Sequence, residues 1–516
     1  MSLPVIPITG VDANYRVPAV LAEIVFNQGP ATASAPTRNV CFVMPKLSSG
    51  SWTAATPYQV KNESDAITGA GSGSPLHRAI RVFLQSNKDA TVYAVPVTAT
   101  AGGSPATATA TITLATNATG TGTAVATIAG EDCSASFVSG ATPTTVGDAL
   151  VASINAKTWL PCTASNAAGT VTLTAKIAGA SQGTGTLTVH RVRVTITTGV
   201  GMTAVASGGL GSVTAGADGS TTEAANTLAA LNAIVARRFY YMVSSAVDAT
   251  TLGHFKLHLS TKAEPRRGMR CVGIAAYPGT LANAQTLATT LNFPRLQVAW
   301  QRNPDTSPDE IAGNVAAIRQ KREAVDSAAN MAGYRDADWL IKPAYTTSDW
   351  PDDNDQNDGI TDGLAVIASD ETGSYLVMSV NTKSKDSTGA VDDFRACETH
   401  RVSVPDEFVD ELLQNTRLKF GQKKLKNDEF LPDGTVNPNQ RRIRDVITPS
   451  IVGATVKSQL TDYENNGKIQ DAELSKAGLQ VLKSPANAAR IECGFDIHTI
   501  DHAHQFTFRV AEVSTG

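Results

Sequence analysis

Oxygen-bearing side chains recur at the spacing of an EF-hand calcium loop in the stretch DYENNGKIQDAE, residues 462–473. Aspartate stands at loop position 1, glutamate at 3, asparagine at 5, glycine at 6 and glutamate at 12. An EF-hand also needs a helix on each side, and here LSKAGLQVLK follows, where a glycine and then a strand pattern appear. We expect instead the end of a helix that begins near Pro449, with Gly467 as its left-handed cap. Calcium binding is the less favoured alternative.

Three further motifs have the residue types of catalysis or metal binding but not the required surroundings. GASQG (179–183) matches a nucleophile elbow around Ser181, but it stands between two alternating strands and predicts a hairpin turn. GAGSGS (69–74) follows a helical segment, so it predicts a turn and a helix cap instead of a dinucleotide loop. HFKLH (254–258) has two histidines but no glutamate between them and no evident third ligand. We therefore expect neither an enzyme nor a cofactor or metal.

The bulk composition disfavours several other classes. The chain has 516 residues, is 42% hydrophobic and 17% charged, and carries a net charge of −4, whereas polyanion-binding proteins are normally basic. No apolar run approaches the roughly 18–20 residues that cross a bilayer. The opening MSLPVIPITGVDANYRVP lacks the basic and apolar blocks of a secretory signal. We expect folding in the cytosol, with no nucleic-acid or membrane partner.

Strands alternating with helices predict an α/β body with a mainly parallel, covered sheet. Its first part is residues 23–97, where Ser74 and Pro75 have the types of an N-cap and a first helical residue. Its second part is residues 221–494, where SPDE (307–310) forms a capping box. The elements expected along these two parts are strands 39–44, 90–97 and 374–382 and helices near 63–68, 222–236, 250–260, 281–291 and 406–420.

Residues 98–220 interrupt the body with a different composition. Alanine, threonine, glycine and serine dominate, and alternating runs such as TATITLAT and GTVTLTAKI stand between glycine-rich turns. One helical run, TTVGDALVASINAK, separates them. This pattern predicts an inserted, surface-exposed β-rich domain.

Both ends of the chain read as extended arms. In residues 1–22, Pro4, Pro7 and Pro18 prevent a helix, and the segment shows no period of 3.6 or 2.0. In the closing residues, 495–516, the run HQFTFRV alternates apolar and polar side chains as a half-buried strand does.

Basic residues gather between the two last helices of the body. Acidic residues interrupt the stretch and it has no ladder of aromatic side chains, so an acidic protein partner is favoured over nucleic acid. The stretch contains Arg417, Lys419, Lys423, Lys424, Lys426, Arg441, Arg442 and Arg444.

Four segments, in order along the chain, resemble the contractile-tail sheath proteins of Mu-like myophages. VIPITGVDANYRVPAVLAEIVFNQGP is similar to the family's apolar arm, Arg-Val-Pro and "AE" strand, and GSPLHRAIRVFLQSNKDATVYAVPV to its G-S-x-L helix and following strand. ITPSIVGATVKSQLTDYENNGKIQD resembles a TP-initiated helix with a Glu-rich end, and LQVLKSPANAARIECGFDIHTI the segment after it. Ala489-Arg490 departs from the family's Asn-Arg at that position.

The resemblance implies a structural subunit of a phage tail in the virion, assembled in the host cytoplasm. Such subunits form stacked hexameric rings around a tail tube, contract from a metastable extended state to drive the tube through the host envelope during DNA injection, and meet baseplate and tail terminator proteins. The resemblance also implies that the arms add strands to neighbouring subunits, and that Lys423, Lys424, Lys426, Arg441, Arg442 and Arg444 face the tube or a neighbour. The expected arm contacts are Val5, Ile6, Ile8, Arg16, Val17, Gln505, Phe506, Thr507, Phe508, Arg509 and Val510.

The six cysteines contain no CxxC pair, so structural zinc is not expected. Cys41 and Cys271 lie in apolar strand patterns and are expected to be buried. The other four stand in segments that read as exposed. A virion leaves the reducing cytosol, so these four are candidates for disulfides between subunits: Cys133, Cys162, Cys397 and Cys493.

The sequence is also compatible with two other functions. The sheath of a tailocin or of a secretion-type injector would use the same assembly mechanism. A surface or adhesive structural protein is suggested by the Thr/Ala-rich insert, although the missing secretory signal argues against it.

Overall fold

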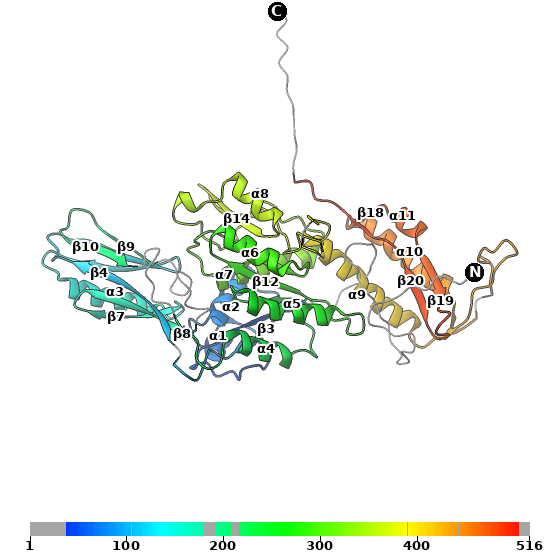
Figure 1. Ribbon diagram of the computed structural model, residues 1–516, viewed down its shortest axis with the longest axis horizontal. Coiled ribbons are helices and arrows are strands. Elements are labelled where there is room, and N and C mark those ends of the chain that lie inside the picture. The colour runs from blue at the N-terminus through cyan, green and yellow to red at the C-terminus, as the bar shows by residue number, and fades with distance from the viewer. Residues whose placement is uncertain are drawn as a thin grey trace, which may run out of the picture. The chain divides into compact units, whose positions relative to one another are not determined.

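The computed structural model describes residues 38–104, 106–179, 192–207, 216–386, 388–389, 391–441 and 443–504 (Figure 1). These described residues fall into two compact units. The body unit contains residues 38–325 and Gly333–Val402, and the C-terminal unit contains Asp326–Ala332 and residues 403–504.

An eight-stranded sheet forms the centre of the body unit, in the order β15-β14-β13-β12-β11-β1-β3-β2. Its six inner strands run parallel, which confirms the mainly parallel sheet predicted from the alternation of strands and helices. The two edge strands, β2 (Tyr58–Val60) and β15 (Gly373–Leu376), run antiparallel to their neighbours. The inner strands are β1 (Val40–Pro45), β3 (Val92–Val97), β11 (Tyr241–Val243), β12 (Val272–Tyr277), β13 (Leu296–Trp300) and β14 (Ala365–Asp370).

Helices cover both faces of this sheet. Successive side chains of β1 show this, because Phe42 meets Phe83 of α2 with ring centroids 5.5 Å apart, whereas Cys41 and Val43 pack in a cluster with Leu231 of α4. On one side, α1 (Glu63–Ala70), α2 (Pro75–Ser86) and α7 (Pro308–Val325) pack together. On the other lie α4 (Glu223–Ala233), α5 (Ala249–Ala263), α6 (Leu281–Leu291) and α8 (Asp353–Thr361).

Local capping explains where two of these helices begin. The Ser74 hydroxyl accepts a hydrogen bond from the His77 backbone N–H at 3.0 Å, and Pro75 is the first residue of α2. At the start of α7 the Ser307 backbone N–H donates to Glu310 Oε2 at 3.4 Å, as in a capping box, and the Ser307 hydroxyl donates to the same oxygen at 2.7 Å. Both caps confirm the expectations from sequence.

The insert has two antiparallel sheets and a hydrophobic core of its own. Buried and accessible side chains alternate along its longer strands, and helix α3 (Pro143–Ala156) packs on β6 and β7. One sheet contains β10 (Thr203–Ser207), β4 (Thr107–Ala115), β8 (Thr170–Ala178) and β7 (Cys162–Ala167), and the other β6 (Glu131–Phe137), β5 (Gly122–Ile128) and β9 (Val192–Ile196).

The C-terminal unit is built on helices and short strands. Phe408 of α9, Tyr463 of α10 and Phe495 form the aromatic centre of its core, with the first two ring centroids 4.6 Å apart. Its elements are α9 (His400–Phe420), which begins just before the unit, α10 (Pro449–Asn465), α11 (Ala472–Ala477), β16 (Lys424–Leu425), β17 (Val446–Ile447), β18 (Ile469–Gln470), β19 (Gln480–Lys483), β20 (Ile491–Gly494) and β21 (His498–Thr499).

Four boundaries differ from the sequence-based expectation. The expected C-terminal arm, 495–516, does not begin at 495, because Phe495 packs in the core of the C-terminal unit and His498–Thr499 pairs with β18. The expected second part of the body, 221–494, is divided, because residues 403–494 pack around the core of the C-terminal unit. The strand expected over 374–382 ends as β15 at Leu376. Helix α9 begins at His400 instead of near 406, and it contains Pro405, which has no N–H to donate to the residue four positions earlier.

No helix among the residues that the structure describes is long and apolar enough to span a membrane.

Candidate assembly surface

The C-terminal unit contains small sheets that have only two strands each within the described residues. In one of them β19 and β20 pair antiparallel, with Val481 opposite Cys493 and Leu482 opposite Glu492. In another, β18 pairs with β21. A lone pair of strands is marginally stable in water, and the outer edge of such a pair can accept a further strand. The outer edge of β19, which has no strand beside it in the described part of the chain, is therefore a candidate site for strand addition.

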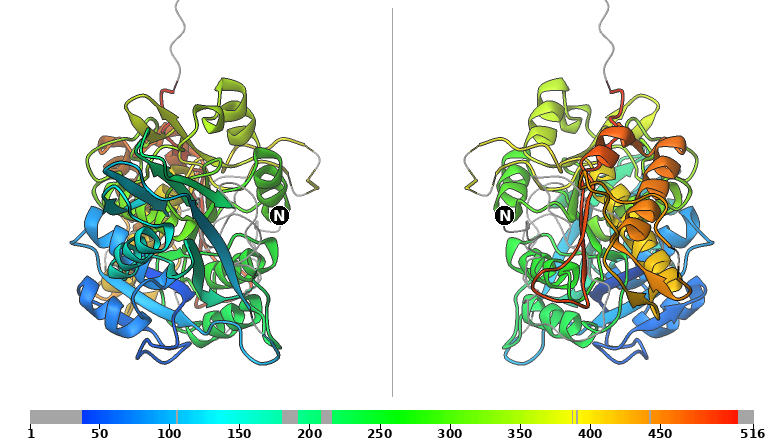
Figure 2. Two further views of the ribbon diagram at one scale, coloured as in Figure 1. Left: turned by 90° about the vertical axis from the view of Figure 1, so that its left-hand side faces the viewer. Right: turned by 90° about the vertical axis from the view of Figure 1, so that its right-hand side faces the viewer.

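Helix α10 supports the β19–β20 hairpin at close range. The two lie side by side in the right-hand view of Figure 2, where the hairpin is red and α10 orange. At Gly453 a Cβ atom would lie 3.2 Å from Cγ2 of Val481, which is tighter than an ordinary contact. Glycine thus allows the helix to approach the strand at Val481, whose side chain is half-buried.

A buried charge fixes the turn of the same hairpin. Glu492 is 2% exposed, and Arg490 Nε donates to its Oε1 atom at 2.9 Å. The Ser484 backbone N–H donates to the Arg490 carbonyl at 2.8 Å, which closes the two strands. In this structure Arg490 neutralises Glu492.

The basic segment, residues 417–447, presents both charge and apolar surface. Leu418, Phe430 and Ile443 are exposed by 77%, 64% and 47%. Lys424 and Arg441 are exposed, and no ion pair involves them among the described residues. Exposed apolar side chains among positive charges are typical of a protein-binding surface.

The other candidate residues of this segment differ in their surroundings. Lys423 Nζ lies 3.2 Å from Asp445 Oδ1, and Lys426 Nζ lies 2.5 Å from Glu429 Oε1, so these two charges are partly neutralised within the chain. Arg444 is 96% exposed and lies 3.6 Å from Asp445. Arg442 is outside the described residues.

The EF-hand-like stretch forms a helix end and a tight turn. Helix α10 ends at Asn465 and Gly467 has φ +67°, as expected from the sequence. Contrary to expectation, a short helix, α11, follows. Glu464 Oε1 accepts from the Ala472 backbone N–H at 2.9 Å, and Glu473 pairs with Lys476 at 2.6 Å. These two glutamates therefore cap a helix and pair with a lysine instead of converging on a common centre.

The structure corrects the expected exposure of the cysteines. Cys133, Cys162 and Cys397 are only 0%, 3% and 4% exposed, and Cys493 is half-buried. Burial raises the pKa of Cys162 and Cys397 to about 12. Cys133 of β6 and Cys162 of β7 are buried positions of these strands, and both belong to the core of the insert. In the folded chain these three thiols are not available at the surface for a disulfide between subunits.

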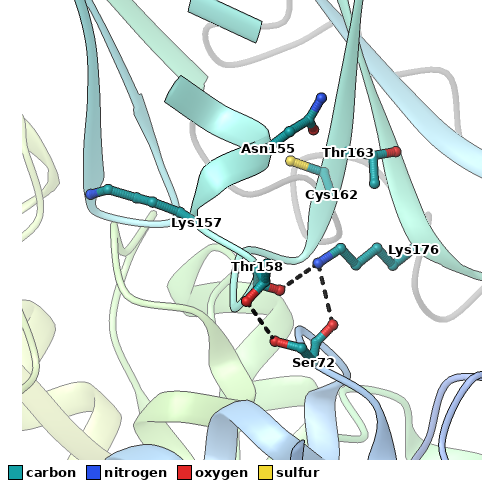
Figure 3. Close-up of a pocket in the computed structure, with 7 residues that line it drawn as sticks. All are labelled: Ser72, Asn155, Lys157, Thr158, Cys162, Thr163 and Lys176. Atoms are coloured by element: carbon teal, nitrogen blue, oxygen red, sulfur yellow. Dashed lines mark hydrogen bonds between the residues drawn. The ribbon is translucent and has the colours of Figure 1, made fainter. Parts of the chain in front are cut away.

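A cavity of about 270 Å³ lies where the insert meets the α1–α2 turn of the body (Figure 3). Lys176 Nζ donates to the carbonyl oxygens of Thr158 at 2.6 Å and Ser72 at 3.2 Å. The two hydroxyls of Ser72 and Thr158 lie 3.1 Å apart. Burial lowers the pKa of Lys176, but its ammonium group is already bound by two carbonyls. This arrangement attaches the insert to the body and presents no reactive constellation.

The remaining sequence candidates fall in two groups. His258 of the HFKLH motif is buried in α5, and burial lowers its pKa to about 4. Ser181 and the expected arm contacts, residues 5–17 and 505–510, lie outside the described residues.

Comparison with known proteins adds only distant likenesses. No protein-family model and no curated protein matches the chain. Among solved structures, a sheath tail protein from Desulfitobacterium hafniense is 12% identical with a TM-score of 0.44, covering 92% of this chain and 100% of that one. A sheath tail protein from Listeria innocua is 12% identical with a TM-score of 0.46, covering 93% of this chain and 95% of that one. Likenesses at this level are too remote to establish a shared fold or function.

Proposed function

We propose that this chain is the structural subunit of a contractile tail sheath. The support is the order of four sheath-like sequence segments, together with one structural feature, the outer edge of β19, which has no strand beside it among the described residues. In this proposal the subunits form stacked hexameric rings around a tail tube. No cofactor takes part, and the work of contraction comes from re-packing between subunits.

Strand addition supplies the cohesion of the proposed polymer. The arms, residues 1–22 and the closing residues 505–516, would pair with sheet edges of neighbouring subunits, such as the outer edge of β19. Each added backbone hydrogen bond contributes about 0.5–1.5 kcal/mol net. Burial of Phe506 and Phe508 would contribute roughly 1.5–3 kcal/mol each. A single exchanged strand would therefore hold two subunits together while their bodies rotate.

The basic segment provides a second kind of contact in the proposal. Its exposed Lys424 and Arg441, with Phe430 nearby in the sequence, suit an acidic surface on the tail tube or on an adjacent subunit. Modest interfaces of this kind fit a metastable extended state. A gain of a few kcal/mol per subunit on contraction would sum over many linked subunits.

Negative-stain microscopy of the expressed full chain tests the proposal. We expect rings or tubes of sheath-like diameter, and we expect Phe506→Ala/Phe508→Ala to abolish them. Leu474→Ala, which truncates a 61% exposed side chain on α11, is the matched control and should assemble normally. A soluble monomer that shows no assembly at high concentration would contradict the proposed function.

The particle in which the subunit works requires a second measurement. We propose the tail of a phage virion, with tube, baseplate and tail terminator proteins as partners. Mass spectrometry should find the chain together with capsid proteins in purified particles that contain DNA. Its recovery only from particles without capsid or DNA would instead indicate a tailocin or a secretion-type injector.

A further inference from the structure

A continuous buried polar network crosses the body unit beneath α7, with Glu323 at one end of it. Its Oε1 atom accepts from Arg319 Nε at 2.7 Å, one turn earlier on the same helix. Its Oε2 atom accepts from the Tyr241 hydroxyl at 2.6 Å and from Arg38 Nη1 at 3.2 Å. Arg319 and Glu323 are 1% and 2% exposed, so this is an ionic cluster removed from water.

The network continues across the sheet to the start of α9. Arg319 Nη1 donates to Gln297 Oε1 at 3.1 Å, and Gln297 Nε2 donates to Ser379 Oγ at 3.0 Å. The Thr399 hydroxyl lies 3.0 Å from the same Ser379 oxygen. Gln297, Ser379 and Thr399 are 0%, 8% and 2% exposed, so hydrogen bonds connect Arg38 to Thr399 entirely within the body.

Members of this network lie next to places where the chain enters or leaves the body. Glu323 is in the last turn of α7, just before the chain passes into the C-terminal unit between Val325 and Asp326. Thr399 directly precedes α9. Within α9, between Val402 and Ser403, the chain passes from the body unit into the C-terminal unit for a second time. Arg38 lies two residues before the start of β1. Chain segments far apart in sequence are thus bonded to one another at these points.

Stability alone does not account for such an arrangement. Removing two charges from water is costly, and apolar side chains of similar volume commonly give equal or greater stability. What a fully bonded polar network adds is a single defined geometry, because each member has few directions in which its hydrogen bonds are satisfied. A network in this position would therefore constrain the paths of the linking segments.

We propose that the Glu323 network is a junction that couples the segments linking the body unit to the C-terminal unit, so that displacement of one is transmitted to the others. The proposal depends on the path of a single chain and does not require the sheath function. It predicts that a local change at one end loosens the other end, which independent structural contacts would not do.

Hydrogen exchange on the full chain tests this coupling. Arg319→Met/Glu323→Leu removes the ionic centre, and Arg78→Met/Asp309→Leu is the matched control because it removes a buried ion pair near the other end of α7. We expect about tenfold faster exchange in peptides covering 326–332 and 400–404 in the first variant, equivalent to ~1.4 kcal/mol, and exchange within about threefold of the parent in the control. Equal acceleration in both variants, or none at the linking segments, would overturn the proposal.

Thr399→Val is a second, milder variant in case the ionic variant does not fold. It removes the hydroxyl contact with Ser379 at the α9 end. Coupling predicts faster exchange at 326–332 as well as at 400–404. Faster exchange confined to 400–404 would show a local effect and would contradict the proposed junction.

Discussion

Arg78 Nη2 donates to Asp309 Oδ1 at 2.7 Å and joins α2 to α7 inside the body unit. Each of these side chains is 4% exposed. Burial raises the pKa of Asp309 to about 6, although the Arg78 guanidinium opposes the change. The ion pair therefore lies where a charge carries a desolvation penalty, and the opposite charge of each side chain offsets the penalty of the other.

Breaking this pair should be far more damaging than replacing it. Asp309→Ala leaves the Arg78 charge buried alone, and we expect it to cost about 3–5 kcal/mol of unfolding free energy. Arg78→Met/Asp309→Leu should restore stability to within ~1 kcal/mol of the parent or exceed it. Urea unfolding of the three proteins at pH 7 provides the comparison. A double variant no more stable than Asp309→Ala would show that the pair stabilises the body in its own right.

Acid should destabilise the body through His258. Burial lowers its folded-state pKa to about 4, with Lys262 and Arg267 contributing in the same direction, whereas an unfolded histidine titrates near 6.5. Between these two pKa values the unfolded chain binds more protons, so stability is lost as the pH falls from 6.5 toward 4. At pH 4.5 this difference in proton binding lowers the free energy of unfolding by about 2–3 kcal/mol.

The substitution His258→Leu should remove this contribution. We expect a smaller fall in the urea midpoint of the variant than of the parent between pH 7 and 4.5. His254→Gln, on the same helix, controls for the loss of an imidazole. The same pH dependence in parent and His258→Leu would contradict the assignment. Asp309 acts in the opposite direction, because its raised pKa makes the folded state bind more protons between about 3.8 and 6.

The buried cysteines should be inert until the chain unfolds. With a pKa of about 12, Cys162 and Cys397 have roughly 10³-fold less thiolate at pH 8 than an ordinary thiol. Labelling with a thiol-reactive disulfide should therefore be slow in the folded protein and rapid in about 6 M guanidinium. Mass spectrometry identifies the labelled residue. Fast labelling of Cys133, Cys162 or Cys397 in the folded chain would restore them as disulfide candidates.

Charge reversal in the basic segment should weaken binding to an acidic partner without affecting the fold. Lys424→Glu/Arg441→Glu removes two exposed positive charges, each contributing at most about 1 kcal/mol in a rim contact. Co-sedimentation with the tube protein at low and high salt gives the measurement. Lys61→Glu/Lys88→Glu, at two exposed lysines of the body, makes the same change in net charge elsewhere. Equal losses in both variants would mean that total charge, and not this segment, matters.

Features formed by neighbours along the chain could be predicted from the sequence. The caps at Ser74 and Ser307 join residues three positions apart, and Gly467 ends a helix through its own backbone freedom. The parallel sheet follows from the regular alternation of apolar strands and helices. In each case the interaction lies within one element or repeats along it, so the pattern of residue types is sufficient.

Contacts between distant residues were decided by the tertiary structure alone. Arg38 and Glu323 are 285 positions apart and Arg78 and Asp309 are 231 apart, so no sequence spacing indicates either pair. Cys133 and Cys162 lie among small, weakly apolar residues, and only the packing of two sheets and α3 buries them. The sequence by itself determined local conformation and the α/β alternation. Burial and the pairing of remote charges required the folded chain, because both depend on which surfaces meet.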